Sequence, residues 1–255
     1  MGINSNEFIL TVPAKLGDGL YALMVGSWLY KRWGRKIHWV LPRCFGPFLY
    51  IEKLLRAQEM TARVTLVDHQ IRDFSCGGQP YKFDPATFGI MGEYYNLGFR
   101  TYPYCFLPEF YASEYGIGYD PGFVLNIGDH FRSDDRDAPI LRSSELAMQM
   151  LMPDVETIPT AVDLLYLSRV LAGAREFHSW FCGLAVLCWL ANIPATVYRV
   201  EGHAPLRLYF PQPRNLKFVE LAVHPKDMKP EQQMRFVIYA DGSGLVNPPE
   251  RICQR

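Results

Sequence analysis

The chain has 255 residues, and 49% of them are hydrophobic, so it is long enough for one large or two small domains with a substantial core. Lys and Arg together number 26, as do Asp and Glu, and this balance excludes a global polycation that would hold nucleic acid or an acidic membrane. The 6 cysteines are scattered without a CxxC pair, which indicates free thiols, and no Cys or His spacing typical of a metal site occurs.

The ends and apolar runs of the chain predict where it resides. Residues 1–8 lack the charged and apolar regions of a signal peptide. The longest apolar run, at 180–191, is too short to span a bilayer. We therefore expect a cytoplasmic protein with no membrane span.

Residues 8–42 predict a strand–loop–helix–strand unit of βαβ length. The expected elements are a strand at 8–12, a turn with Gly17, Asp18 and Gly19, a helix at 20–33 and a strand at 37–41. In open parallel sheets, ligands bind beyond the carboxyl ends of the strands, which is where this turn falls. Asp18 there suits a base that takes a proton from a hydroxyl group. Asp is also a favoured N-cap residue, and both interpretations stay open at this point.

The alternation of strands and helices continues with a helical stretch at 48–58 and a strand at 63–67. This order favours a parallel sheet with right-handed crossovers. Residues 76–121 then interrupt the rhythm with many Gly, Pro and aromatic residues. The aromatic segment at 81–123 is either an acceptor-binding lip, because Tyr gives large and rigid contact area, or an irregular packed subdomain or oligomer interface.

A second α/β block is expected from residue 122 onward. Strands are expected at 123–127, 155–158, 176–178, 195–198, 217–223 and 234–239, and helices from Ser143 or Ser144 to Met150, at 161–172 and at 180–191. The sequence thus predicts an α/β fold with two Rossmann-like parallel-sheet domains, 1–121 and 122–255, and a ligand cleft between them.

A first candidate phosphate site in this block follows the expected strand at 123–127. Gly128 opens the loop, and Arg132 lies four residues further on. An Arg at this place could grip a phosphate through two parallel hydrogen bonds. The aspartates of the same loop could equally pair with that Arg on a solvated surface.

A second candidate site precedes the apolar helix expected at 180–191. His178, Ser179 and Trp180 lead into that helix, whose free N–H groups and positive dipole end favour a diphosphate. Gly183, one turn further, leaves room for a ligand to approach closely. The alternative is a capped core helix in which Gly183 is only a packing contact.

Several segments resemble the heptosyltransferase-like glycosyltransferases of the GT-B fold. Residues 15–20 (KLGDGL) resemble the N-terminal loop of that family, 163–174 resemble one of its helices, and 178–185 (HSWFCGLA) fall where the family begins its donor-binding helix. The resemblance implies that Asp18 is the catalytic base and that Ser179 and its neighbours hold the donor diphosphate.

The resemblance predicts a compact GT-B-like glycosyltransferase of the hexosyl or heptosyl type. It would transfer a sugar from a nucleotide-diphosphate sugar to a hydroxyl acceptor, with no metal and no further cofactor. The expected donor-binding residues are Gly17, Gly19, Gly128, Arg132, His178, Ser179, Trp180 and Gly183. The family pattern changes at His178, Trp180 and Gly183, which leaves the donor sugar and nucleotide open.

The acceptor and two rival functions also stay open. A saccharide, a lipid-linked sugar and a hydroxymethylated DNA base are all compatible with the sequence, although the neutral net charge argues against DNA. One rival is an epimerase or hydrolase on the same scaffold. The other is a non-catalytic GT-B-like binding protein that holds a nucleotide, or a partner through the aromatic segment.

Overall fold

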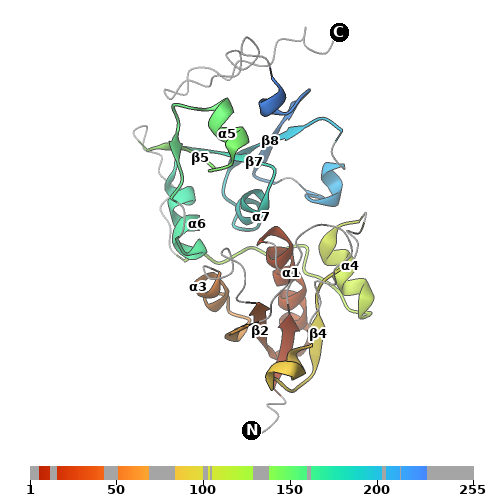
Figure 1. Ribbon diagram of the computed structural model, residues 1–255. Helices are drawn as coiled ribbons and strands as arrows, with labels where there is room; N and C mark the ends of the chain where they lie inside the picture. Colours follow the sequence, from red (N-terminus) through yellow and green to blue (C-terminus); the bar gives the residue numbers. More distant parts are fainter. Residues whose placement is uncertain are drawn as a thin grey trace. The chain divides into compact units, whose positions relative to one another are not determined.

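The computed structural model describes residues 6–11, 16–42, 51–68, 84–99, 103, 105–128, 138–159, 162–202, 205–212 and 214–228. The chain divides into two compact units, each with its own parallel sheet (Figure 1). Unit 1 comprises Met1–Gly128, Ala161–Leu165 and Leu206–Gln212, and unit 2 comprises the remainder. The boundary expected at 121/122 therefore falls seven residues early, and two short later segments belong to unit 1.

The sheet of unit 1 contains β1 (Glu7–Thr11), β2 (Lys36–Pro42), β3 (Thr61–Val67) and β4 (Tyr94–Asn96) in the order β3-β2-β1-β4. All of its strand pairs are parallel. The apolar runs of β1 and β2 are buried, as is usual for a parallel sheet that is covered on both faces. The first three strands confirm the sequence prediction.

Helix α1 (Leu16–Trp33) packs on this sheet through a glycine in its middle. A Cβ atom at Gly26 would lie only 2.6 Å from Cη2 of the buried Trp39 in β2. This close approach explains why a residue that costs about 1 kcal/mol in a helix stands here. Trp39 also donates a 2.9 Å hydrogen bond from Nε1 to Oγ1 of Thr61, so its one polar atom is satisfied.

The other helices that the structure describes in unit 1 are α3 (Glu52–Arg56), the 3-10 turn η1 (Pro85–Phe88), α4 (Leu107–Glu114) and a 3-10 turn in its last segment. Helix α4 contacts α1, and the two lie side by side in Figure 1. Tyr21 of α1 meets Phe106 edge to face at 5.6 Å, and Phe106 meets Tyr119 in the same way. Because Phe99, Phe106 and Tyr111 are buried, these aromatics pack the subdomain and do not line a lip. Tyr81, Phe83, Tyr102 and Tyr104 lie outside the described residues.

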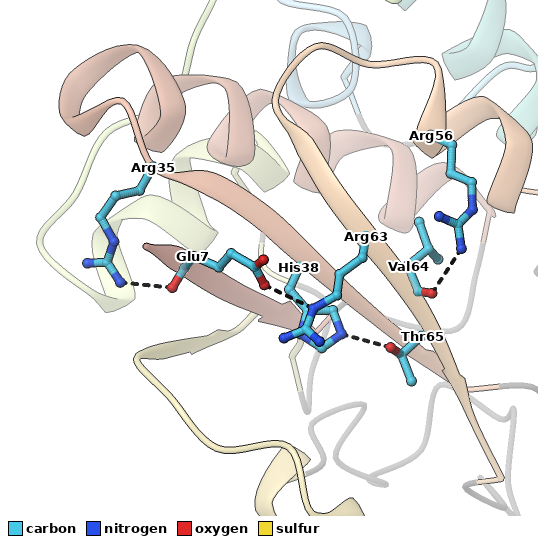
Figure 2. A network of polar contacts seen from close by, with 7 residues as sticks. All are labelled: Glu7, Arg35, His38, Arg56, Arg63, Val64 and Thr65. Carbon is cyan, nitrogen blue, oxygen red and sulfur yellow. Dashed lines mark hydrogen bonds and ion pairs between the residues drawn. The ribbon is translucent and has the colours of Figure 1, made fainter. Parts of the chain in front are cut away.

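A polar network covers the face of this sheet opposite α1 (Figure 2). Glu7 accepts from Nε of Arg63 at 2.9 Å, and Arg35 donates to the backbone oxygen of Glu7 at 2.8 Å. His38 lies beneath Arg63 and bonds Thr65 at 2.8 Å. Burial, and secondarily the Arg63 charge, lowers the pKa of His38 to about 4. The histidine is therefore neutral in the folded protein at pH 7.

The two later segments of unit 1 are held by specific bonds. Lys53 of α3 pairs with Asp163 at 3.0 Å. The Tyr21 hydroxyl donates a 2.6 Å bond to the backbone oxygen of Tyr209, which follows η2 (Leu206–Leu208). The chain thus returns twice to unit 1 after it has entered unit 2.

The sheet of unit 2 contains β5 (Ile140–Arg142), β6 (Glu156–Thr157), β7 (Glu176–Trp180), β8 (Ala195–Val200) and β9 (Leu216–Leu221) in the order β6-β5-β7-β8-β9. All of its strand pairs are parallel. Its helices are α5 (Leu146–Leu151), α6 (Leu164–Gly173), which begins in unit 1, α7 (Gly183–Leu190) and the 3-10 turn η3 (Pro225–Asp227). Ile140, Met148, Leu151 and Tyr198 belong to the core between α5 and the sheet.

Several expected elements differ from the structure. The segment 123–127 forms no strand and lies in no sheet. The Gln58 side chain bonds its backbone instead: the amide oxygen accepts from Asn126 N and the amide nitrogen donates to Asn126 O, both at 2.9 Å. Helix α5 has Glu145, not Ser143 or Ser144, at its N-cap. Helix α7 begins at Gly183, three residues later than expected. The strand expected at 234–239 lies outside the described residues.

Candidate functional site

Each sheet has one place where its strand order reverses direction, and in open α/β sheets ligands bind beyond the carboxyl ends of the strands at that place. In unit 1 the reversal lies between β1 and β4. The last residues of these strands, Thr11 and Asn96, face each other, and the Thr11 hydroxyl donates a 2.7 Å bond to Oδ1 of Asn96. The Tyr115 hydroxyl accepts from Asn96 N at 2.9 Å and donates to Asn96 O at 3.0 Å. We call this group the unit 1 edge.

Gly17, Asp18 and Gly19 lie in the first turn of α1, not in a loop before it. The sequence prediction placed the helix start at residue 20, and the structure places it at Leu16. Asp18 is half-buried there, and a carboxylate in a first helical turn is favoured by the helix dipole. Asp18 is therefore not the N-cap residue of α1, since an N-cap residue precedes the first turn. The capping interpretation is wrong.

In unit 2 the strand order reverses between β5 and β7. Ser143, directly after β5, joins the two strand ends: its N–H donates to His178 O at 2.9 Å, and its Oγ accepts from Trp180 N at 3.3 Å. We call residues 142–145, with the end of β7 and the start of α7, the unit 2 edge. Three of the expected donor-binding residues, Ser179, Trp180 and Gly183, lie here.

His178 and Ser179 are part of β7, and both are 0% exposed. His178 bonds Tyr198 through Nδ1 and Glu176 through Nε2, each at 3.2 Å. Its pKa is lowered by burial, although Glu176 opposes the shift. The Ser179 hydroxyl donates to Trp180 O at 2.8 Å. The strand expected at 176–178 continues to Trp180, so His178 and Ser179 do not lead directly into the helix, and their side chains lie in the interior of unit 2.

The start of α7 keeps part of the expected geometry. Cys182 occupies the N-cap in an extended conformation and makes no side-chain capping bond. The first N–H groups of α7, beginning at Gly183, are thus not capped by that side chain. Burial, and then the neighbouring Glu145 carboxylate, raises the pKa of Cys182 to about 12, so the thiol stays protonated. Trp180 is half-buried and meets the His224 ring at 5.2 Å.

The first candidate loop has a different setting. Gly128 closes unit 1 with a φ of 75°, and its N–H donates to the Asn126 side chain at 2.9 Å. Gly128 therefore belongs to a tight turn in unit 1. Arg132 lies outside the described residues.

Sequence reasoning missed Arg142, the last residue of β5, which is 8% exposed. A signal was present: an arginine ends a short apolar run and precedes two serines and a glutamate. Within the described ranges, no group of three or more His, Cys, Asp and Glu side chains could hold a metal ion. None of the described helices combines the length and hydropathy that a membrane span requires.

Comparisons by sequence find nothing: no family model and no curated protein matches the chain. Comparisons of structure do find similar folds. The glycosyl transferase family 9 protein from Veillonella parvula DSM 2008 is 10% identical, with 87% of each chain covered and a TM-score of 0.58. The chain has the GT-B fold.

The heptosyltransferase WaaC of E. coli shares this GT-B fold. Its structure with ADP is 12% identical and covers 84% of this chain and 93% of its own, with a TM-score of 0.54. Its structure with ADP-2-deoxy-2-fluoro heptose gives 11% identity, coverage of 84% and 92%, and a TM-score of 0.50. The two sheets expected for a GT-B fold are confirmed, while the cleft between them stays a prediction.

Proposed function

We propose that the protein is a glycosyltransferase that moves a sugar from a nucleotide-diphosphate sugar to a hydroxyl acceptor without a metal ion. The observation that carries this proposal is the GT-B fold, shared with glycosyltransferases over more than four fifths of the chain. The WaaC structures hold ADP and an ADP-heptose analogue, which supports a nucleotide-diphosphate donor here.

In this proposal, unit 1 binds the acceptor and supplies the base. Asp18 stands in the first turn of the helix that follows β1, next to Gly17 and Gly19. Its carboxylate takes the proton of the acceptor hydroxyl while the oxygen attacks the anomeric carbon of the donor. The bond between that carbon and the diphosphate oxygen breaks, and the nucleoside diphosphate leaves with the electron pair.

Unit 2 holds the donor. The N–H groups of Gly183 and Leu184, at the start of α7, stabilise the diphosphate as its charge grows in the transition state. Trp180 offers a half-buried ring beside them. Arg132 keeps its proposed role in the donor site, whereas Gly128 lies in a turn of unit 1. His178 and Ser179 support the site from the interior of β7. No metal is needed, because these dipoles and cations balance the leaving charge.

The test compares Asp18→Asn with the exposed control Asp154→Asn. Labelled ADP-, UDP-, GDP- and CMP-sugars are screened for hydrolysis and for transfer to saccharide, lipid-linked and nucleic-acid acceptors. We expect Asp18→Asn to lower transfer by about 100-fold or more, because general-base catalysis contributes that much, while nucleotide affinity stays unchanged. Equal rates for wild type and Asp18→Asn would remove Asp18 as the base.

A non-catalytic binding protein is the second candidate. It is favoured by the burial of His178 and Ser179, since side chains expected at the donor are closed off in β7. The same screen separates the two functions. Thermal stabilisation by nucleoside diphosphates without any product would support the binding protein, whereas a labelled glycoside or free sugar would support the enzyme.

A further inference from the structure

Arg142 is a buried cation that has no anionic partner among the residues placed in the structure. The residue is 8% exposed, and within the described part of the chain its one hydrogen bond runs from Nη1 to the backbone oxygen of its neighbour Ser143, at 3.3 Å. Its Nε is buried and makes no hydrogen bond, and among the residues that the structure describes no carboxylate pairs with it. A buried charge is costly unless it is paired and hydrogen-bonded, so this arrangement calls for a counter-ion.

Arg199, in β8 of the same sheet, is a buried structural arginine with which Arg142 can be compared. It is as deeply buried as Arg142, at 5% exposed, and its Nε likewise makes no hydrogen bond, but its Nη2 pairs with Glu220 of the neighbouring strand at 2.8 Å. The contrast indicates that the missing partner of Arg142 is not a general feature of arginines in this sheet.

The position of Arg142 points to a ligand. It ends β5 at the reversal between β5 and β7, where a ligand is expected in an open α/β sheet. Ser143 bonds the end of β7 through both its N–H and its Oγ, so the loop that carries Arg142 is fixed in place. Arg142 can donate several further hydrogen bonds in the planar geometry that suits phosphate.

A second unsatisfied charge lies in the same loop. One carboxylate oxygen of Glu145, Oε2, is buried without a hydrogen-bond partner. Glu145 forms no ion pair with Arg142 within the described residues, and it lies beside the Cys182 thiol at the start of α7. A carboxylate repels a phosphate but accepts readily from a hydroxyl group. The loop thus offers a cation and an acceptor that do not satisfy each other.

We propose that Arg142 and Glu145 bind a ligand that carries both a phosphate and a hydroxyl group, with the phosphate on Arg142 and the hydroxyl on Glu145. Nucleoside diphosphates and sugar phosphates have this chemistry. As a nucleotide-sugar site the assignment rests on the proposed function, and it adds two residues to the donor site that the sequence did not indicate.

The binding test uses Arg142→Met, with Arg169→Met at an exposed position of α6 as the matched control. The probes are inorganic pyrophosphate, ADP, UDP and GDP, measured by calorimetric titration. We expect Arg142→Met to weaken the tightest-binding probe by about 30-fold or more, because a buried charged contact is lost, while Arg169→Met binds as wild type does. Equal affinities in wild type and Arg142→Met would overturn the proposal.

A stability measurement without ligand separates binding from a structural role. If Arg142 awaits an anion, Arg142→Met removes an uncompensated buried charge, and the melting temperature of the free protein should stay equal or rise. A structural arginine would show the opposite: a clear fall in melting temperature with unchanged probe affinity in the folded fraction, which would overturn the proposal.

Glu145→Gln tests the hydroxyl contact on its own. This variant should bind the nucleoside diphosphates about tenfold less tightly while pyrophosphate, which has no carbon-bound hydroxyl, binds equally well or better. Pyrophosphate binding that depends on Arg142, without turnover of any nucleotide sugar, would support this site and refute the proposed transferase. If the protein turns over a nucleotide sugar and Arg142→Met does so at the same rate, the transferase is supported and the site at Arg142 is refuted.

Discussion

The unit 1 edge and the unit 2 edge occupy the same place in their sheets but balance their polar groups differently. At the unit 1 edge, Thr11, Asn96 and Tyr115 are neutral and bond one another. At the unit 2 edge, Arg142 is buried, Glu145 is half-buried with one buried carboxylate oxygen, and the two charges are not paired with each other. A set of neutral groups that satisfies itself is stable without a ligand, whereas unpaired charges lower stability until a ligand supplies their partners.

The largest expected effect on stability comes from the core of unit 1, which packs behind the unit 1 edge. Trp39 is 0% exposed and fills the space that Gly26 leaves in α1. Trp39→Ala should lower the free energy of unfolding by about 4 kcal/mol, measured by urea denaturation, because it removes a large buried side chain and leaves a cavity. A loss below about 1 kcal/mol would mean that the packing of α1 on β2 contributes little.

The stability of the protein at acid pH compares the two units through one buried histidine in each, His38 in unit 1 and His178 in unit 2. The folded-state pKa of His38 is about 4, below its ordinary value of 6.5, so the unfolded chain binds the proton first. Stability should therefore be complete above pH 6.5 and fall as the pH drops toward 4. We expect a loss of about 2 kcal/mol from this group, reduced by partial solvent screening.

His38→Gln is the variant that isolates this effect, with His224→Gln at a half-buried position of unit 2 as the control. Denaturation at a series of pH values should show a flatter profile for His38→Gln than for the control. His178 has a carboxylate neighbour, Glu176, that opposes the lowering of its pKa by burial, so unit 2 is expected to contribute less to the slope. A profile that is identical for His38→Gln and wild type would refute the assignment.

The smallest effect concerns the unit 1 edge directly. Thr11→Val keeps the shape of the side chain but leaves Oδ1 of Asn96 without the 2.7 Å bond from the hydroxyl. The free energy of unfolding should fall by about 1.5 kcal/mol. Arg142→Met at the unit 2 edge should show no such fall. If Thr11→Val were neutral and Arg142→Met destabilising, the contrast between the two edges would be reversed.

Several parts of the fold were predictable because they depend on local patterns. The apolar runs at β1, β2 and β3, separated by a helix with polar and apolar faces, determine three parallel strands whatever surrounds them. The apolar stretch that became α7 was correctly predicted as a buried helix. Its start was not, because Trp180 continues β7 by pairing with Tyr198, and strand pairing is decided by a distant segment.

The candidate site was less predictable than the fold. The sequence indicated Asp18, Trp180 and Gly183 from their places next to expected strands and helices. It could not indicate that His178 is closed off by Tyr198 and Glu176, nor that Gln58 would replace a strand partner for Asn126. The contacts of His178 with Tyr198 and of Gln58 with Asn126 join residues that lie far apart in the chain, and no periodicity of the sequence predicts them.

The sequence by itself determined an α/β chain with two parallel sheets, because hydrophobic periodicity and turn residues act over short distances. Only the tertiary structure decided which polar side chains became interior, which paired and which stayed unsatisfied, since burial and pairing depend on what the rest of the chain brings near. Arg142 and Arg199 are both arginines in apolar strands. Their neighbours in space make Arg199 a structural residue and Arg142 a candidate for ligand binding.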